Sequence, residues 1–111
     1  MWELVRVIGG GFGSPGSCNG QLIRPRGLRF IGDGSGICVA DSGNSRASVF
    51  RVGDGGFVRH MVRGLSHPTD VEEVEGGWLV ACCEAHTVEF VGDGVGVGRP
   101  FLGKGKAGLV P

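Results

Sequence analysis

The residues in this chain that are best suited to chemistry are three histidines and a pair of adjacent cysteines. Cys82 and Cys83, followed by His86, are residue types that bind zinc. Successive side chains of a strand point to opposite faces, however, so both thiolates would not easily bind one ion. His60 and His67 lie on other predicted elements, at spacings that indicate no shared site. We also find no acid–base pair, nucleophile elbow or phosphate-binding loop, and therefore expect no enzyme activity, no catalytic residues, no metal and no cofactor.

Composition favours a folded chain with reduced thiols. Hydrophobic residues make up 41% of the 111 residues and the formal net charge is zero, so disorder and a general affinity for nucleic acid are not indicated. The longest uncharged run, residues 7–23, is rich in glycine and broken by Pro15, which argues against a membrane span. Residues 1–5 lack the features of a signal peptide. We expect a cytoplasmic location, no membrane contact, a buried Cys38 and an exposed Cys18.

Two copies of one pattern account for most of the chain. Pro25, Pro68 and Pro111 lie 43 residues apart, each shortly after a leucine. With a shift of 41 residues the middle of the first copy aligns on the second without gaps, so that Val39 matches Val80. A fixed period in this range indicates a repeat architecture, in which no single repeat can bury its apolar face alone.

Each copy is predicted to form four strands. Short runs rich in Val, Ile and Phe alternate with clusters of Gly, Asp and Asn that suit tight turns. The predicted strands cover residues 27–31, 36–40, 46–51 and 57–62, and then 70–74, 78–82, 86–91 and about 97–102. Residues 4–8 resemble residues 57–61, which predicts one further strand ahead of the first copy. No window has a 3.6-residue apolar period, so we expect an all-β chain with essentially no helix. Four short strands per repeat are typical of a propeller blade.

The apolar positions of these strands predict the core. Ten residues should form it: Leu28, Phe30, Ile37, Val39, Val49, Val71, Val74, Trp78, Val80 and Phe90. Arg29, Glu72 and Glu73 fall on the first strand of each unit, where they are expected to pair with one another or to be hydrated in a central channel.

The first copy also carries an ordered series of marker residues. Leu22, Pro25, Gly27 and Leu28 are followed by VADSGNSR at residues 39–46 and by Val49-Phe50. This series resembles the NHL repeat, whose pattern has a Pro-Gly start, a strand ending in Ala-Asp, a polar turn with Asn, an Arg and a Val-Phe strand. The second copy departs from the pattern, since Cys82, Ala85 and Thr87 replace the Asp, Asn and Arg of the turn.

The resemblance implies antiparallel four-stranded blades of a β-propeller. The expected layout is a partial blade at residues 1–22, blades at 23–65 and 66–108, and the start of another at 109–111. Asp41 and Asn44 should bond to backbone groups across the polar turn, and Arg46 should pair with Asp41. Two blades leave apolar faces open. We therefore expect the chain to belong to a longer propeller or to assemble with copies of itself, an unstable product being the third reading.

The predicted strand order sorts the charges. In a four-strand meander, the turns between second and third strands and the links between blades lie at one end. A basic loop face is predicted there, formed by Arg24, Arg26, Arg46, Arg63, His67, His86, Lys104 and Lys106, against the acids Asp41 and Glu84. The other end collects Asp33, Asp54, Glu75 and Asp93 against Arg51.

The resemblance implies a non-catalytic scaffold that binds a protein or peptide. RNA binding through the basic face is an alternative, although RNA readout also uses stacking aromatics and the chain has no Tyr. A further alternative is a fragment of an enzyme with an NHL-like propeller, of the zinc-dependent amidating lyase type.

Overall fold

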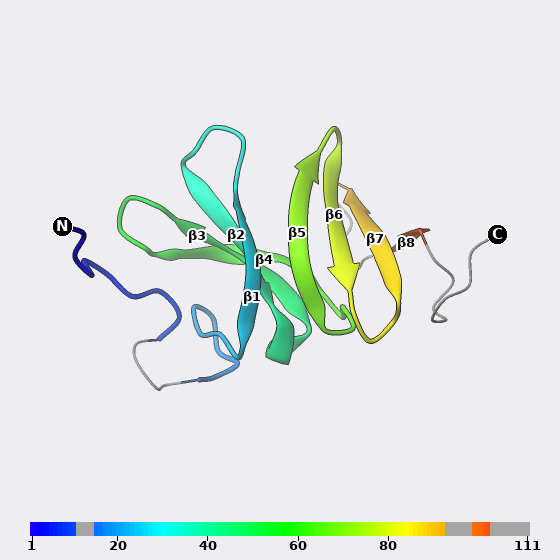
Figure 1. Cartoon of the computed structure of the whole chain (residues 1–111), viewed down its shortest axis with the longest axis horizontal. Helices are drawn as coiled ribbons and strands as arrows, with labels where there is room; N and C mark the ends of the chain where they lie inside the picture. The colour runs from blue at the N-terminus through cyan, green and yellow to red at the C-terminus, as the bar shows by residue number, and fades with distance from the viewer. Residues whose placement is uncertain (11–14, 93–98, 103–111) are drawn as a thin grey trace.

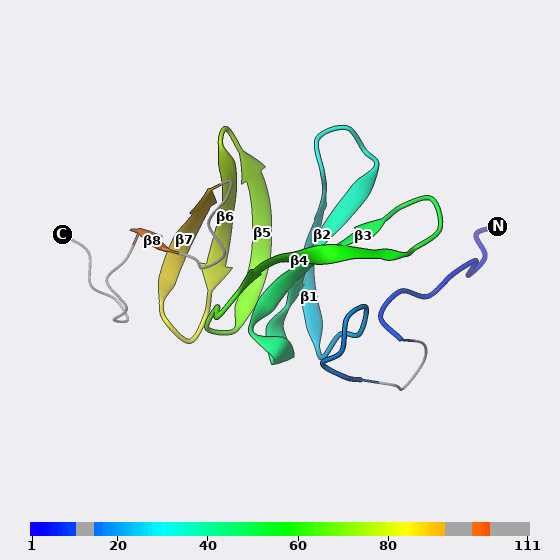
Figure 2. The ribbon, with the colours of Figure 1, turned by 180° about the vertical axis from the view of Figure 1, so that it is seen from behind.

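The chain folds into two antiparallel sheets that pack side by side (Figures 1 and 2). The computed structural model describes residues 1–10, 15–92 and 99–102. The first sheet has the order β1-β2-β3-β4 and the second the order β5-β6-β7-β8. The strands are β1 (Pro25–Phe30), β2 (Gly36–Asp41), β3 (Arg46–Arg51), β4 (Phe57–Arg63), β5 (Pro68–Val74), β6 (Gly77–Cys82), β7 (Thr87–Gly92) and β8 (Arg99–Leu102). One 3-10 turn, η1 (Ser42–Asn44), is the sole helical element in these residues, and no helix among them is long and apolar enough to cross a membrane.

The all-β prediction is confirmed, and each predicted strand has its counterpart within two residues. The exception is residues 4–8, for which the prediction of a strand is wrong. They pair with no strand in the described part of the chain, and Leu4 and Val5 are 71% and 82% exposed. An apolar, β-branched run forms a strand when an edge is available to satisfy its backbone groups, and here none lies beside it. The predictions for residues 97–98 and 103–111 fall outside the described residues.

The strand register repeats between the two sheets. Cys38 pairs with Val49 across β2 and β3, and Leu79 pairs with Phe90 across β6 and β7. The same shift of 41 residues relates every pair of these two ladders, because both hairpins have turns of the same length. The repeat seen in the sequence is therefore a repeat of hydrogen-bonded structure.

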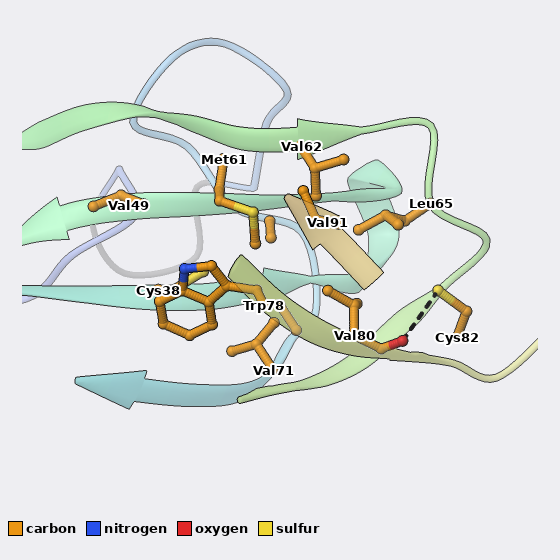
Figure 3. Close-up of a cluster of buried hydrophobic side chains, with 12 residues drawn as sticks. Cys38, Val49, Met61, Val62, Leu65, Val71, Trp78, Val80, Cys82 and Val91 are labelled. Atoms are coloured by element: carbon orange, nitrogen blue, oxygen red, sulfur yellow. Dashed lines mark hydrogen bonds between the residues drawn. The ribbon is translucent and has the colours of Figure 1, made fainter. Parts of the chain in front are cut away.

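The core lies between the sheets (Figure 3). The first sheet contributes small side chains, including Cys38, Ala40 and Ala47, all of them 0% exposed. They allow the β5 and β6 side chains Val71 and Val80 to approach closely, at 1% and 0% exposure. Close packing of this kind stabilises by roughly 25 cal/mol for each Å² of apolar surface removed from water.

Half of the predicted core residues are fully buried: Val39, Val49, Val71, Trp78 and Val80. Ile37, Val74 and Phe90 are half-buried. The prediction is wrong for Leu28 and Phe30, which are 49% and 63% exposed. Both lie on β1 and point to the side of the first sheet away from the second, so alternation along the strand places them outside the shared core.

Charged residues join the two sheets along β1 and β5. Arg29 Nε lies 3.3 Å from Glu72 Oε1, and a second guanidinium nitrogen lies 3.4 Å from Asp70 Oδ2. The backbone N–H of Gly32 donates to Glu73 Oε1 over 2.7 Å. The expected pairing of Arg29 with Glu72 is thereby confirmed. These groups are about half exposed, so they fix the relative position of the strands more than they add stability.

Truncation of a buried ring tests the described core. Trp78→Ala should lower the free energy of unfolding by about 3–5 kcal/mol, because it leaves a cavity between the sheets. Phe50→Ala should do the same on the other side of the first sheet, where the Phe50 ring lies edge-on to Phe57 at 5.8 Å. Urea denaturation followed by circular dichroism measures both. Val52→Ala is the control, since Val52 is 40% exposed, and a loss equal to that of Trp78→Ala would contradict the packing.

Candidate functional site at the basic end

Five predicted basic residues gather at one end of the two sheets, named here the basic end. Arg24 precedes β1, Arg26 lies in its first residues, Arg63 ends β4, His67 precedes β5 and His86 lies in the β6–β7 turn. These segments all meet at the lower end in Figure 1. All five side chains are exposed. Lys104 and Lys106, also predicted for this face, lie outside the described residues.

Acidic residues occupy the opposite end. Asp33, Asp54 and Glu75 lie in the β1–β2, β3–β4 and β5–β6 turns. Hydrogen bonds from Ser35 lower the pKa of Asp33, and the hydrogen bond from Arg51 leads the causes that lower the pKa of Asp54. Both carboxylates are therefore ionised at neutral pH. The described part of the chain has opposite charges at its two ends, as the strand order predicts; Asp93 is outside it.

A hollow of about 540 Å³ opens beside the basic end. Arg26 reaches it from the first sheet, and the second sheet supplies the remaining lining: Thr69, Ala81, Cys82, Cys83, His86, Thr87 and Val88. The hollow therefore combines apolar side chains with a guanidinium, an imidazole and hydroxyl groups. Such a mixture suits a ligand that brings both an apolar part and a negative charge.

Three of these basic residues, Arg24, His67 and His86, have a left-handed backbone, which the sequence did not predict. Arg24 and His67 have φ of 48° and 50°, each directly before the proline that starts β1 or β5. Ser45 and His86 have φ of 54° and 56° at equivalent points of the two hairpin turns. Non-glycine residues adopt this conformation at a cost and retain it where surrounding structure demands it. The repeated positions indicate that the turns fix the direction of the basic side chains.

Arg46 belongs to the structure of the turn and not to the exposed basic face. Its side chain is 8% exposed, and its Nε–H donates to Asp41 Oδ2 over 2.9 Å. Its terminal nitrogens donate to the carbonyl oxygens of Ser17, Cys18 and Gln21. These bonds use four of the five N–H donors of the guanidinium, and its burial keeps the side chain from contributing to an exposed surface. The prediction that Arg46 contributes to the binding face is therefore wrong, whereas its predicted pairing with Asp41 is confirmed.

Asp41 is the centre of this buried network. Its side chain is 0% exposed, and Oδ1 accepts a hydrogen bond from the backbone N–H of Ile23 over 2.8 Å. Oδ2 also accepts one from the Asn44 amide, which donates to the carbonyl of Gly16 as well. The network thus holds residues 16–23 against the first sheet. Asp41 and Asn44 were predicted to bond to backbone groups across the polar turn; their backbone partners are instead Ile23 and Gly16 of the preceding segment, and Asp41 makes no side-chain cap hydrogen bond to η1.

A serine, a histidine and an asparagine form a chain of polar contacts that no sequence pattern indicates. Ser48 Oγ lies 3.0 Å from His60 Nδ1, and His60 Nε2 lies 2.9 Å from Asn19 Oδ1. The order resembles that of a nucleophile, a base and an orienting group. Ser48 is 1% exposed, however, so no substrate reaches its oxygen. We assign the three residues to the attachment of residues 16–23 to β3 and β4.

The cysteines have the environments of structural thiols. Burial raises the pKa of Cys38 to about 12 and is the largest cause that raises the pKa of Cys82 to about 11. Both thiols are therefore protonated and unreactive at neutral pH. Cys18 and Cys83 are exposed, and all four cysteines are free. Within the described residues no three His, Cys, Asp or Glu side chains come together as a metal site.

Comparisons with protein-family models, with curated proteins and with solved structures gave no match. The function must therefore be argued from the geometry of the chain itself.

Loss of the Asp41 charge should strongly destabilise the chain. Asp41→Asn leaves the Arg46 guanidinium buried without a counter-charge and should lower the free energy of unfolding by about 3–5 kcal/mol. The double variant Asp41→Cys/Arg46→Thr, which carries the residues of the second sheet, should lose less because no buried charge remains. Urea denaturation of all three proteins measures this, and a double variant less stable than the single one would contradict the account.

The His60 contact predicts a dependence of stability on pH. Burial is the largest cause that lowers the pKa of His60 below its ordinary value of 6.5, followed by the charges of Arg46 and Arg63. The unfolded chain therefore binds this proton more readily than the folded chain, and stability falls as the pH drops below about 6.5. Unfolding measured between about pH 7.5 and about pH 5.5 should show this loss, and His60→Gln should reduce it. An equal loss of stability in the His60→Gln variant would mean that other groups cause the pH dependence.

Proposed function

We propose that the chain is a non-catalytic binding scaffold whose basic end takes an acidic segment of another protein. The observation that carries the proposal is the hollow beside that end, where Arg26 and His86 lie next to apolar lining residues. Arg24, Arg63 and His67 extend the positive surface beyond the hollow. Arg24, His67 and His86 have a left-handed backbone at repeated positions of the two sheets, which sets the direction in which each side chain leaves the chain.

We further propose that the two sheets are consecutive blades of an NHL-type propeller. Three features support this reading: four antiparallel strands in each sheet, the register repeat of 41 residues, and the side-by-side packing through β1, β2 and β5. The Asp41, Asn44 and Arg46 network at the first polar turn also agrees with the resemblance of that turn to the family. In a propeller, turns at one end of the blades form a shared binding surface.

Binding is favoured over catalysis because the one hydroxyl found in contact with an imidazole among the described residues is inaccessible, and two of the four thiols are protonated. Ser48 and His60 are in contact but Ser48 is buried, and the two thiols of raised pKa are protonated. RNA remains the second candidate, since the same positive groups would attract phosphates. The hollow has no Phe or Trp in its lining, and base stacking on such rings is a main source of affinity for single-stranded RNA.

Charge reversal at the basic end tests the proposal. A labelled poly-glutamate peptide should bind the chain, and Arg24→Glu/Arg26→Glu should weaken that binding at least about tenfold by replacing attraction with repulsion. Fluorescence anisotropy measures the affinity. Arg51→Glu, a charge reversal at the opposite end, is the matched control and should leave the affinity nearly unchanged.

The alternative ligand is tested in the same assay with labelled oligouridylate. Tighter binding of the RNA than of the peptide, with a steep loss of affinity as salt rises, would replace the proposal with RNA binding. Equal affinity of the peptide for the original chain and the double variant would rule out the basic end as the site.

A further inference from the structure

The two sheets contact each other through different faces. Cys38 and Ala40, on the first sheet, lie in the shared core. Their counterparts after the shift of 41 residues are Leu79 and Ala81, which lie on the side of the second sheet away from that core. The contact is thus heterologous, with one face of the first sheet against the opposite face of the second.

This arrangement leaves an apolar face on the second sheet open. We name it the outer face and define it by Leu79, Ala81 and Val88 with the flanking acids Asp70 and Glu72. The three apolar side chains are half-buried, whereas their counterparts in the first sheet are 0% exposed. A hollow of about 140 Å³ lies on this face, lined by those five residues and Val71. The face therefore has the residues of an interface without the sheet that covers its counterpart.

The complementary surface on the first sheet is open along β1, whereas on the neighbouring strands Val39 and Phe50, the counterparts of Val80 and Val91, are 4% and 1% exposed. Val71 on β5 is 1% exposed because it packs on the first sheet. Its counterpart on β1 is Leu28. Val71 pairs with Val80 and Leu28 pairs with Val39, and Val39 and Val80 are related by the shift of 41 residues. Leu28 is 49% exposed and its neighbour Phe30 is 63% exposed. Residues 16–23 are held by Asp41, Arg46 and His60 and leave these β1 side chains uncovered.

The charges beside the two open faces are complementary. Arg29 is opposite Cys38 in the register, and Glu72 is opposite Leu79, so these two residues occupy equivalent positions in the two sheets. Within one chain they form an ion pair. If the first sheet of another copy were placed on the outer face, Glu72 would have the position in the new contact that Arg29 has in the contact within the chain. Glu72 would then lie next to Arg29 of the other copy. Opposite charges would again face each other, alternating along the assembly.

We propose that the outer face of the second sheet is the docking surface for the first sheet of a second copy of this chain. Each copy has one surface of each kind, so the assembly is head-to-tail and places Leu28 of one copy against the outer face of another, as Val71 lies against the first sheet within the chain. Such a contact continues from copy to copy until it closes into a ring. The docking surfaces lie on the sides of the sheets, so the proposal stands apart from ligand binding at the basic end.

Complementary variants test this directionality. Leu79→Asp blocks the outer face and Leu28→Asp blocks the complementary face, so each should raise the dissociation constant for self-association at least about tenfold. Light scattering after size exclusion, over a range of concentrations, measures the mass. Mixing the two variants should form a one-to-one dimer and nothing larger, since one intact surface of each kind remains. Val52→Asp, an equivalent change at an exposed valine in the β3–β4 turn, should associate as the original chain does.

Circular dichroism on each peak shows whether a variant is folded, and Leu79→Thr with Leu28→Thr is the milder pair if an aspartate variant unfolds. A folded monomer or an unfolded original chain at the highest concentration would contradict the proposal, and a sheet from a different chain or segment would then have to cover the face. Association that survives Leu28→Asp, or a mixture that does not restore the dimer, would also overturn it.

Discussion

The packing of the small side chains of the first sheet against β5 and β6 is the contact on which the rest of the structure depends. Cys38, Ala40 and Ala47 have no exposed surface, and their small size permits Val71 and Val80 to lie directly against the sheet. A larger side chain at these positions would separate the sheets, since interiors are close-packed and tolerate added volume poorly. The same contact positions Arg29 next to Glu72 and allows Arg26 to reach a hollow formed mainly by the second sheet.

The two copies have the same backbone geometry in the turn between their second and third strands, but the side chains of that turn differ. In both, the residue that ends the turn is left-handed and donates its N–H to a carbonyl three residues earlier, from Ser45 to Ser42 and from His86 to Cys83. In the first copy, buried charges occupy the turn and attach residues 16–23. In the second, those charges are absent, and Cys83 and His86 line an open hollow. We infer that the first turn serves stability and that the second is available for ligand binding.

The sequence was sufficient to predict the strands β1 to β8, because the alternation of apolar residues and the glycine-rich turns are local patterns that can be seen in neighbouring residues. It also predicted the pairing of Asp41 with Arg46 and the separation of charges to the two ends. It did not predict that Arg46 is buried, because that depends on residues 16–23 folding back over the sheet. The exposure of Leu28 and Phe30 was missed for a related reason: burial of an apolar strand face requires a neighbour, and β1 has one on a single side. The Ser48, His60 and Asn19 contacts join three distant segments and leave no local pattern.

The account treats the two sheets as one unit held by a shared apolar core, and hydrogen exchange tests this most directly. The backbone amides of Cys38 and Val49 in the first sheet, and of Val80 in the second, should be protected to the same degree. They should lose protection together as urea is added, because opening either sheet exposes the core of both. Exchange of one sheet at low urea while the other stays protected would show that the sheets fold independently, and would contradict the central role of the contact between them.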